Sequence, residues 1–203
     1  MSPRRTAAAL FTLLAAATLL GCGSDHEEPP ATPPAHVRPT TAAPASPAET
    51  VRPMAAAKPV RVRIPAAGVD TGPVLELGLA ADGTVEVPPA EQADRIGWYD
   101  KGVTPGETGP AVLIGHFDTA KGPAVLRNVA RIEAGDTISV SRADGTTADF
   151  RVREIEQVDK KTFPTDKVYG NTTRPELRLI TCGGDLVDGH RPDNIILYAD
   201  LVA

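Results

Sequence analysis

Residues 136–158 read DTISVSRADGTTADFRVREIEQV and carry the strongest fold signal in the chain. Apolar and polar side chains alternate in both halves of this stretch, as they do in strands with one buried face. Asp144 and Gly145 stand between the halves, and an Asp-Gly pair between alternating runs predicts a tight β-hairpin turn. The alternation slips by one position at Ile155, which predicts a bulge or bend in the second strand.

Short apolar or alternating runs continue on both sides of this hairpin, with turn signals between them. That rhythm predicts an all-β sandwich or barrel. Residues 90–99 and 123–130 are candidates for one or two short helices, and neither is long enough to form a helical layer. The eight predicted strands are residues 60–64, 74–79, 84–87, 111–116, 136–142, 146–158, 177–182 and 194–202.

The first 22 residues predict an export signal. Arg4 and Arg5 precede the apolar run of residues 6–20, which at about 1.5 Å per residue is too short to span a hydrocarbon core of about 30 Å. The run ends in Leu-Leu-Gly-Cys, which is similar to the lipobox of bacterial lipoproteins and makes Cys22 a candidate for lipidation. An uncleaved signal anchor is the alternative. In either case we expect an exported protein, anchored at the extracellular face of the membrane through its N-terminus.

Residues 23–59 predict a disordered spacer. Nine Pro and nine Ala fall between positions 24 and 59, without an aromatic side chain. Such a stretch buries too little apolar surface to offset the loss of chain entropy, and its Pro content favours an extended chain. It would hold a folded head, residues 60–203, away from the membrane and facing a cell wall.

Charge and side-chain chemistry exclude several classes of partner. The chain has 21 Lys and Arg against 26 Asp and Glu, a formal net charge of −5, which argues against binding nucleic acid. Two His and one Cys without close spacing in the head do not make a closed zinc site, and no EF-hand pattern appears. We therefore expect no metal and no cofactor, although the scattered carboxylates leave open whether a loop binds calcium.

Cys182 is the only cysteine of the predicted head, so no disulfide can form within it. Exported proteins usually pair their cysteines or lack them, so a lone thiol is either a small buried hydrophobe or a reactive group. The predicted strand 177–182 stops at Gly183 and Gly184, which places the thiol where a strand opens into a loop. Such positions present reactive groups, and this favours a nucleophile.

A thiol with a free pKa of about 8.5 needs a proton acceptor or a nearby positive charge to act as a nucleophile. His116 ends the predicted strand 111–116 and is the candidate base, with a core histidine bonded to a backbone carbonyl as the alternative. His190 lies in a polar loop and fits a solvated residue better. Arg191 precedes the last predicted strand, and its guanidinium suits a developing oxyanion, although a surface arginine is the commoner case.

Longer segments around these residues resemble the sortase family of cysteine transpeptidases, most closely the class F sortases of actinobacteria. A Gly-His after an apolar strand, a later Ile-Thr-Cys and a loop Arg form a specific combination. The resemblance covers nearly all of residues 60–203 and implies a closed eight-stranded sortase β-barrel. The similar segments are, in order, RIPAAGVDTGPV, GLAADGTVEVP, GWYDKGVTPGETGPAVLIGHFD, VYG, LRLITCGG and HRPDNIILYA.

The resemblance also implies a reaction. Cys182 would attack the Thr carbonyl carbon of an LPXTG-like sorting signal and form a thioacyl enzyme. His116 would protonate the leaving amine and later deprotonate the incoming one. Arg191 would hold the substrate and the oxyanion, and Thr181 would add a contact near it. An amine such as that of a peptidoglycan precursor would accept the acyl group, whereas water would hydrolyse it.

Two features depart from the family pattern, and two other classes stay open. Many relatives have the Arg directly before the Asp and Asn of the last strand, whereas Pro192 intervenes here. Sortases usually hold the membrane by a transmembrane segment rather than by a lipidated Cys22. An L,D-transpeptidase is also exported and β-rich, but its SHGC-like stretch is missing from this sequence. A tethered lipoprotein binding module would leave Cys182 inert.

Overall fold

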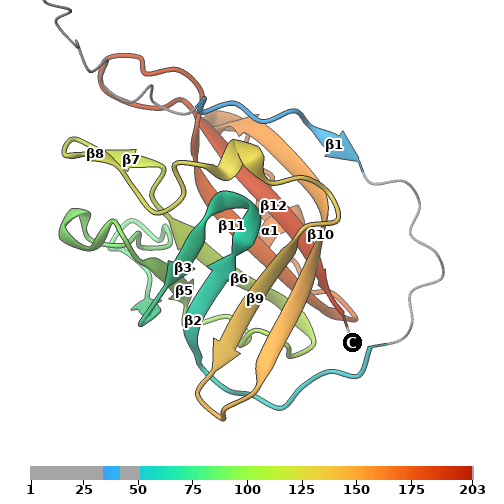
Figure 1. Ribbon diagram of the computed structural model, residues 1–203. Coiled ribbons are helices and arrows are strands. Elements are labelled where there is room, and N and C mark those ends of the chain that lie inside the picture. The colour runs from blue at the N-terminus through green and yellow to red at the C-terminus, as the bar shows by residue number, and fades with distance from the viewer. Residues whose placement is uncertain (1–33, 42–50, 203) are drawn as a thin grey trace, which may run out of the picture. The chain divides into compact units, whose positions relative to one another are not determined.

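The computed structural model describes residues 34–41 and 51–202 (Figure 1). The predicted export signal and Cys22 lie outside the described residues. The strands are β1 Thr40–Thr41, β2 Pro59–Ile64, β3 Val69–Thr71, β4 Leu75–Leu77, β5 Ile96–Tyr99, β6 Gly109–Gly115, β7 Asp118–Thr119, β8 Gly122–Pro123, β9 Thr137–Arg142, β10 Thr147–Asp159, β11 Pro175–Gly183 and β12 Asp193–Leu201. The helical elements are α1 Thr165–Tyr169 and the short 3-10 helices η1 Pro65–Ala67, η2 Ala90–Gln92, η3 Val129–Arg131 and η4 Lys160–Thr162.

Ten of the strands form one sheet that curls into a half-barrel, in the order β3-β2-β9-β10-β12-β11-β6-β5-β4, with β1 paired to β10 (Figure 1). β7 and β8 form a separate ladder. The prediction of an all-β barrel with few helices is confirmed, but the expected closure and the count of eight strands are wrong in detail. Among the described residues, no ladder joins the end strands β3 and β4. They are consecutive in the chain, so residues 72–74 link the two ends of the curled sheet instead.

The predicted hairpin is formed by β9 and β10, which pair antiparallel. Gly145 has a φ of 82°, the left-handed conformation that the tight turn requires and that glycine adopts without steric cost. Phe150 and Val152 point into the core at 0% and 1% exposure. The register of β10 against β12 shifts between Val152 and Glu154, which confirms the bulge predicted from the slip at Ile155.

Three neighbouring strands, β6, β11 and β12, are buried on both faces. Leu113, Leu179 and Leu197 belong to the main core inside the curled sheet, while Ile180 and Ile196 belong to a second apolar cluster on the other face. Burial on both faces explains why these strands read as continuous apolar runs rather than alternating ones. The central part of the sheet is therefore a rigid support for whatever follows the ends of its strands.

The predicted minor elements were less accurate. Residues 84–87 form no strand, and Val85 makes only an isolated bridge to Leu79. Residues 90–99 contain η2 and then the buried strand β5, because pairing of Ile96–Tyr99 with β6 outweighs the weak local helix preference. Residues 123–130 form mostly turns that lead into η3, and α1 was not predicted.

The described parts of the expected disordered spacer lie against the sheet. β1 pairs with β10 at Ile155, beyond the point where β9 stops pairing, so it occupies a free strand edge (Figure 1). Ala35 is 5% exposed, and Met54 donates its backbone N–H to Gly106 (2.8 Å). Within the described residues, no helix is long and apolar enough to cross a membrane. Residues 34–41 and 51–59 thus differ from the prediction, since backbone pairing stabilises a segment that its own side chains could not.

Candidate active site

Parallel pairing brings the predicted cysteine and histidine to one end of the sheet. β6 and β11 are parallel neighbours, with Ile114 opposite Ile180. Two positions further along each strand stand His116 and Cys182, so both emerge at the same edge. Both residues line a cavity of about 1180 Å³. The two residues that the sequence singled out as base and nucleophile therefore share one cavity.

Cys182 is half-buried near the end of β11, opposite Asn194 of β12. It is the free cysteine of the described chain. The two glycines after it allow a tight turn: a Cβ on Gly183 would lie 2.7 Å from the Ile195 side chain, and Gly184 has a φ of 81°. The backbone therefore turns sharply beside the sulfur, and the thiol is neither fully exposed nor packed away as an inert core residue.

His116 is held by a backbone carbonyl. Its Nε2 lies 2.6 Å from the Pro88 carbonyl oxygen, which can only accept, so Nε2 carries the hydrogen. This contact matches the alternative of a histidine satisfied by the backbone, yet the ring also lines the cavity with Cys182. The hydrogen bond fixes the tautomer and leaves Nδ1 as the nitrogen able to take up a proton.

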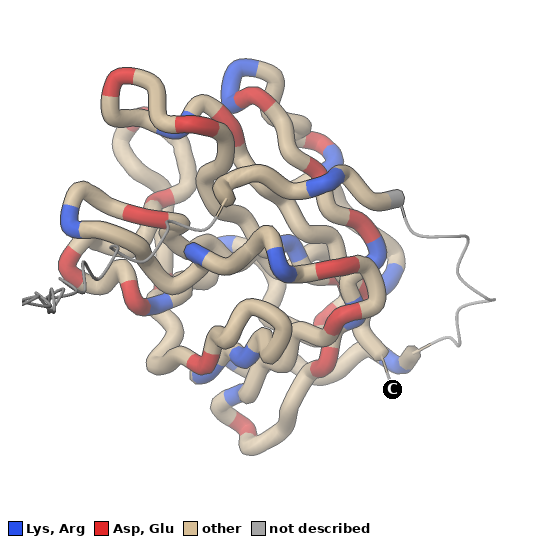
Figure 2. Tube along the Cα trace, turned by 45° about the horizontal axis from the view of Figure 1, so that its top comes forward, with Lys and Arg blue, Asp and Glu red and all other residues tan. Residues whose placement is uncertain are grey.

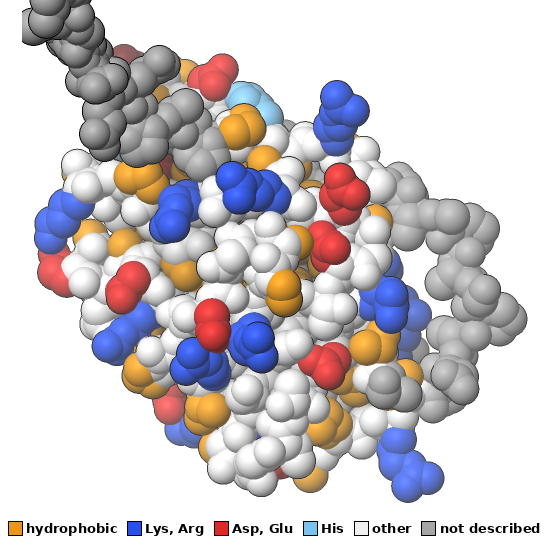
Figure 3. Space-filling model, in the orientation of Figure 1, with side chains coloured by type: hydrophobic (Ala, Val, Ile, Leu, Met, Phe, Trp, Pro, Cys, Tyr) orange, Lys and Arg blue, Asp and Glu red, His pale blue; other side chains and the backbone are white. Residues whose placement is uncertain are grey.

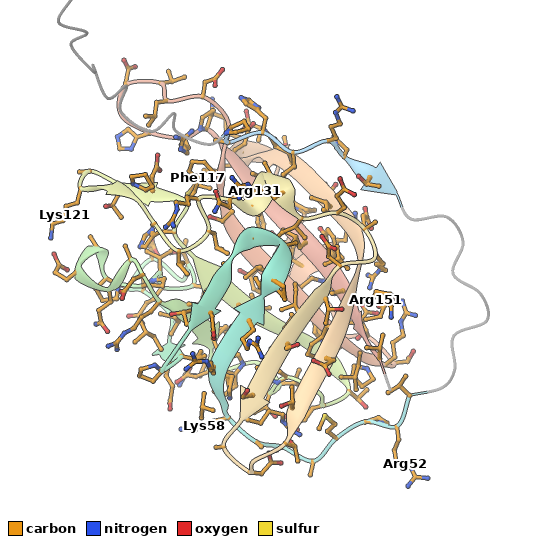
Figure 4. The ribbon with its side chains drawn as sticks, viewed as in Figure 1. Arg52, Lys58, Phe117, Lys121, Arg131 and Arg151 are labelled. Carbon is orange, nitrogen blue, oxygen red and sulfur yellow. The ribbon has the colours of Figure 1, made fainter. Side chains whose placement is uncertain are left out.

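The structure does not bring Arg191 into this cavity. Its guanidinium binds the carboxylate of Asp118, with Nη2 to Oδ2 at 2.7 Å and Nε to Oδ2 at 3.0 Å, and Nη1 donates to the Gly184 carbonyl. Its Cζ also lies 4.5 Å from the ring centroid of Phe117. Phe117 follows β6 and is labelled in Figure 4. The side chain is only 8% exposed. Arg191 therefore ties its own loop to the segment after β6.

Thr181 lies next to the thiol and lines the same cavity. The residue is 3% exposed, and its Oγ1 has no hydrogen-bond partner among the described residues. A buried hydroxyl without a partner costs about 1–3 kcal/mol. A ligand in the cavity that accepted from this hydroxyl would recover that cost, which makes Thr181 a candidate contact.

Lys160 is the residue at this site that the sequence analysis missed. It begins η4, just after β10, and its Nζ lies 3.4 Å from the Cys182 sulfur. The same Nζ donates to the Arg191 carbonyl oxygen at 2.7 Å. Lys160 and Cys182 are 22 positions apart in the chain. They come together only because β10 and β11 both pair with β12, so spacing along the chain gave no signal for this contact.

Away from the thiol, the cavity walls are mainly apolar and aromatic. Tyr169 of α1 packs edge-on against Tyr99 of β5 and also contacts Phe163, each with ring centroids 6.2 Å apart. Burial, and secondarily the nearby Tyr99, raises the pKa of Tyr169, so its phenol stays neutral. No group of three or more His, Cys, Asp and Glu side chains in the described part of the chain could hold a metal ion. The cavity suits an apolar segment of a ligand.

Comparison with known proteins identifies a family for this arrangement. A family model described as a sortase domain matches residues 62–202. Sortase C-1 from Actinomyces oris is similar in structure, with a TM-score of 0.54 and 23% identity over 72% of this chain and 76% of that chain. The Clostridium perfringens sortase D5 transpeptidase gives a TM-score of 0.53 and 22% identity over 72% of this chain and 79% of that chain. Streptococcus agalactiae sortase C1, in complex with MTSET, gives a TM-score of 0.54 and 17% identity over 71% of this chain and 69% of that chain. A search of curated proteins finds no match.

Proposed function

The chain belongs to the sortase family, and from this premise we propose that it is a cysteine transpeptidase that cleaves an LPXTG-like sorting signal after Thr. The observation that carries the proposal is the placement of Cys182 and His116, by adjacent parallel strands, on one cavity. Apolar and aromatic walls on that cavity fit the Leu and Pro of such a signal. The class F subtype is part of the proposal, since the similar structures named above are of the C and D types.

In the first half of the reaction, the Cys182 thiolate attacks the carbonyl carbon of the substrate Thr. A C–S bond forms, and the carbonyl oxygen takes the negative charge. When the tetrahedral intermediate collapses, the C–N bond breaks and protonated His116 gives its proton to the leaving amine. The product is a thioacyl enzyme. In the second half, neutral His116 takes a proton from the incoming amine, which attacks the thioester. A C–N bond forms, the C–S bond breaks, and Cys182 leaves as a thiolate beside protonated His116.

Two more residues have proposed roles. The free Oγ1 of Thr181 donates to the substrate or to its oxyanion, which gives the buried hydroxyl a partner. Arg191 was expected to hold the substrate, but its guanidinium is engaged by Asp118. In this arrangement Arg191 supports the reaction by fixing the loop after Cys182. Direct contact with a substrate would require the guanidinium to leave the carboxylate.

The proposal includes an exported location at the extracellular face of the membrane. The N-terminus, with lipid on Cys22 or as a signal anchor, holds the chain there, and residues 60–203 form the catalytic domain. The partners are the sorting signals of secreted proteins and an amine acceptor such as a peptidoglycan precursor. Basic and acidic side chains are interspersed along the described chain and on the face shown, a pattern unlike that of a nucleic-acid-binding surface (Figures 2 and 3).

The test uses the full chain extracted from membranes. The protein is incubated with an LPXTG-type peptide, with and without an added amine, and Cys182 is examined for a thioester by mass spectrometry. We expect an acyl adduct that ends at Thr, turns over faster with the amine, and is missing in Cys182→Ala. Cleavage that persists in Cys182→Ala would refute the nucleophile. A thiol that forms no adduct across a varied peptide set and resists alkylation would indicate a binding module instead. The mass of the same N-terminus reports whether Cys22 carries lipid.

A further inference from the structure

Lys160 contacts Cys182, and Arg191 contacts the Gly184 carbonyl two residues further on, but the two cations have different partners. The Arg191 guanidinium donates to the Asp118 carboxylate and to a backbone carbonyl, so a carboxylate already compensates its charge. Lys160 has no carboxylate within salt-bridge distance among the described residues. Its Nζ contacts the sulfur at 3.4 Å and the Arg191 carbonyl oxygen at 2.7 Å. The uncompensated positive charge beside the thiol is therefore that of Lys160.

The backbone places Lys160 at this position. β10 pairs with β12 as far as Asp159 opposite Asp193, and the Lys160 N–H then donates to the Pro192 carbonyl at 3.0 Å. The Asp159 carboxylate accepts from the Lys161 N–H at 2.7 Å and so caps η4. Cys182 approaches the same end of β12 from its other side, opposite Asn194. Lys160 is thus held both by its backbone N–H and by its ammonium group. These two bonds keep its Nζ beside the Cys182 sulfur.

We propose that Lys160 is a catalytic residue whose ammonium group stabilises the thiolate of Cys182. Ionisation moves the thiol proton to solvent or to His116, while Lys160 keeps its own protons throughout. An opposite charge this close favours the charged form of an ionisable group. The role belongs to the proposed transpeptidase, but the ionisation itself needs no sorting signal.

Other charged groups near the thiol are also part of the site. His116, just after β6, lines the same cavity, and Asp193 at the start of β12 accepts from Gln157 at 2.6 Å. Substitution of Lys160 leaves all of these groups in place. The other titratable or charged residues that line the cavity are His116, Lys101 and Glu107. Outside it, Asp193 pairs with Gly183, and the Arg191–Asp118 pair is bonded to the Gly184 carbonyl.

A structural role for Lys160 makes a different prediction. The bond from Nζ to the Arg191 carbonyl could order the loop without any effect on the sulfur. Lys160→Arg keeps a positive charge, whereas Lys160→Gln keeps a hydrogen-bond donor without the charge. Lys161 is the matched control, since it is the next residue of η4, is exposed, and does not line the cavity.

The experiment measures the rate of alkylation of Cys182 by iodoacetamide against pH in the full chain, with the modified peptide followed by mass spectrometry. In Lys160→Gln we expect alkylation of Cys182 at neutral pH to slow about tenfold, because the thiolate loses the positive charge beside it. Lys160→Arg restores most of the rate, and Lys161→Gln leaves the profile unchanged. Thermal unfolding of each variant confirms that the fold is retained.

Two results would overturn the proposal: a Lys160→Gln profile that coincides with that of the parent, or a Lys160→Arg profile shifted as far as that of Lys160→Gln. Peptide turnover is measured in parallel. If the parent cleaves no sorting peptide but the alkylation profile still shifts in Lys160→Gln, the substrate proposal fails and the role of Lys160 stands. If the parent cleaves peptide and the profile does not shift, the role of Lys160 fails alone.

Discussion

Thr181 and Cys182 are adjacent in β11, but only the Cys182 side chain has a polar partner in the described chain. The sulfur contacts the Lys160 ammonium group, while the Thr181 hydroxyl is buried with no partner in the described chain. Proteins rarely leave a buried polar group unpaired, and such exceptions call for an explanation. The proposed contact of this hydroxyl with substrate gives one. In that proposal the unpaired hydroxyl lowers the stability of the free protein and contributes to catalysis once substrate is bound.

Thr181→Val tests this separation, because valine keeps the shape and removes the unpartnered oxygen. We expect the free energy of unfolding to stay the same or to rise by up to about 1 kcal/mol. In the same variant kcat should fall by about 100-fold if the hydroxyl donates to the oxyanion. Urea unfolding and peptide turnover measure the two effects. Thr181→Ser is the control, since it keeps the hydroxyl and should keep kcat while losing about 1 kcal/mol of stability. A less stable Thr181→Val would mean that the hydroxyl has a partner.

The candidate site could be predicted from the sequence only in part. Cys182 and His116 were found because each ends an apolar run, and the end of a run is visible in one stretch of sequence. The partners of the site were not found. Asp118 lies 73 positions from Arg191, and Lys160 lies 22 positions from Cys182. Those contacts depend on which strands pair and in what register, which local patterns do not contain.

At the scale of elements, the long strands were predicted, whereas most of the short ones, apart from β4, were missed. β9 and β10 were found by alternation around a turn, and β6, β11 and β12 by apolar runs. β3 and β5 have three and four residues, and a run that short carries no period. Their pairing with neighbours decides their structure, as does that of β1, which uses an edge of β10 that β9 leaves free.

A charge network on β10, β11 and β12 should make stability depend on pH. Burial alone would raise the pKa of Glu176, but the charge of Arg153 and the bonds from Arg174 and Arg178 outweigh burial and hold that pKa below its usual value. A carboxyl with a lowered pKa in the folded state stabilises the fold above its unfolded pKa, about 4.3, and this contribution is lost as the pH falls through the folded value.

Glu176→Gln should therefore cost about 3 kcal/mol at neutral pH, because it removes the carboxylate from the buried Arg178, the half-buried Arg153 and the exposed Arg174. The cost should shrink as the pH falls from the unfolded pKa of about 4.3 through the lower folded pKa, where the parent carboxyl also becomes neutral. Urea unfolding at several pH values measures both effects. Glu133→Gln, at an exposed position, is the control and should follow the parent at every pH. A cost that stays the same at low pH would show that packing, and not charge, holds Glu176 in place.

At the scale of the whole molecule, β6, β11 and β12 join two apolar clusters into one body. Each of these strands contributes side chains to the inner core from one face and to the second cluster from the other. Damage at the edge of the sheet should therefore be felt by the whole domain. Leu77 of the terminal strand β4 is a sensitive point, since it belongs to the second cluster and is 3% exposed.

Gly97→Ala tests whether the domain unfolds as one unit. A Cβ at Gly97 would lie 2.5 Å from Leu77 Cγ, and the buried leucine has little room to move. We expect a loss of about 2 kcal/mol, seen as a lower urea midpoint with a single transition and an unchanged slope. Gly78→Ala, where the nearest atom of another residue is 3.5 Å away, should stay within about 0.5 kcal/mol of the parent. Two separate transitions in Gly97→Ala would contradict the argument, because they would mean that the β4–β5 edge unfolds apart from the strands that carry Cys182 and His116.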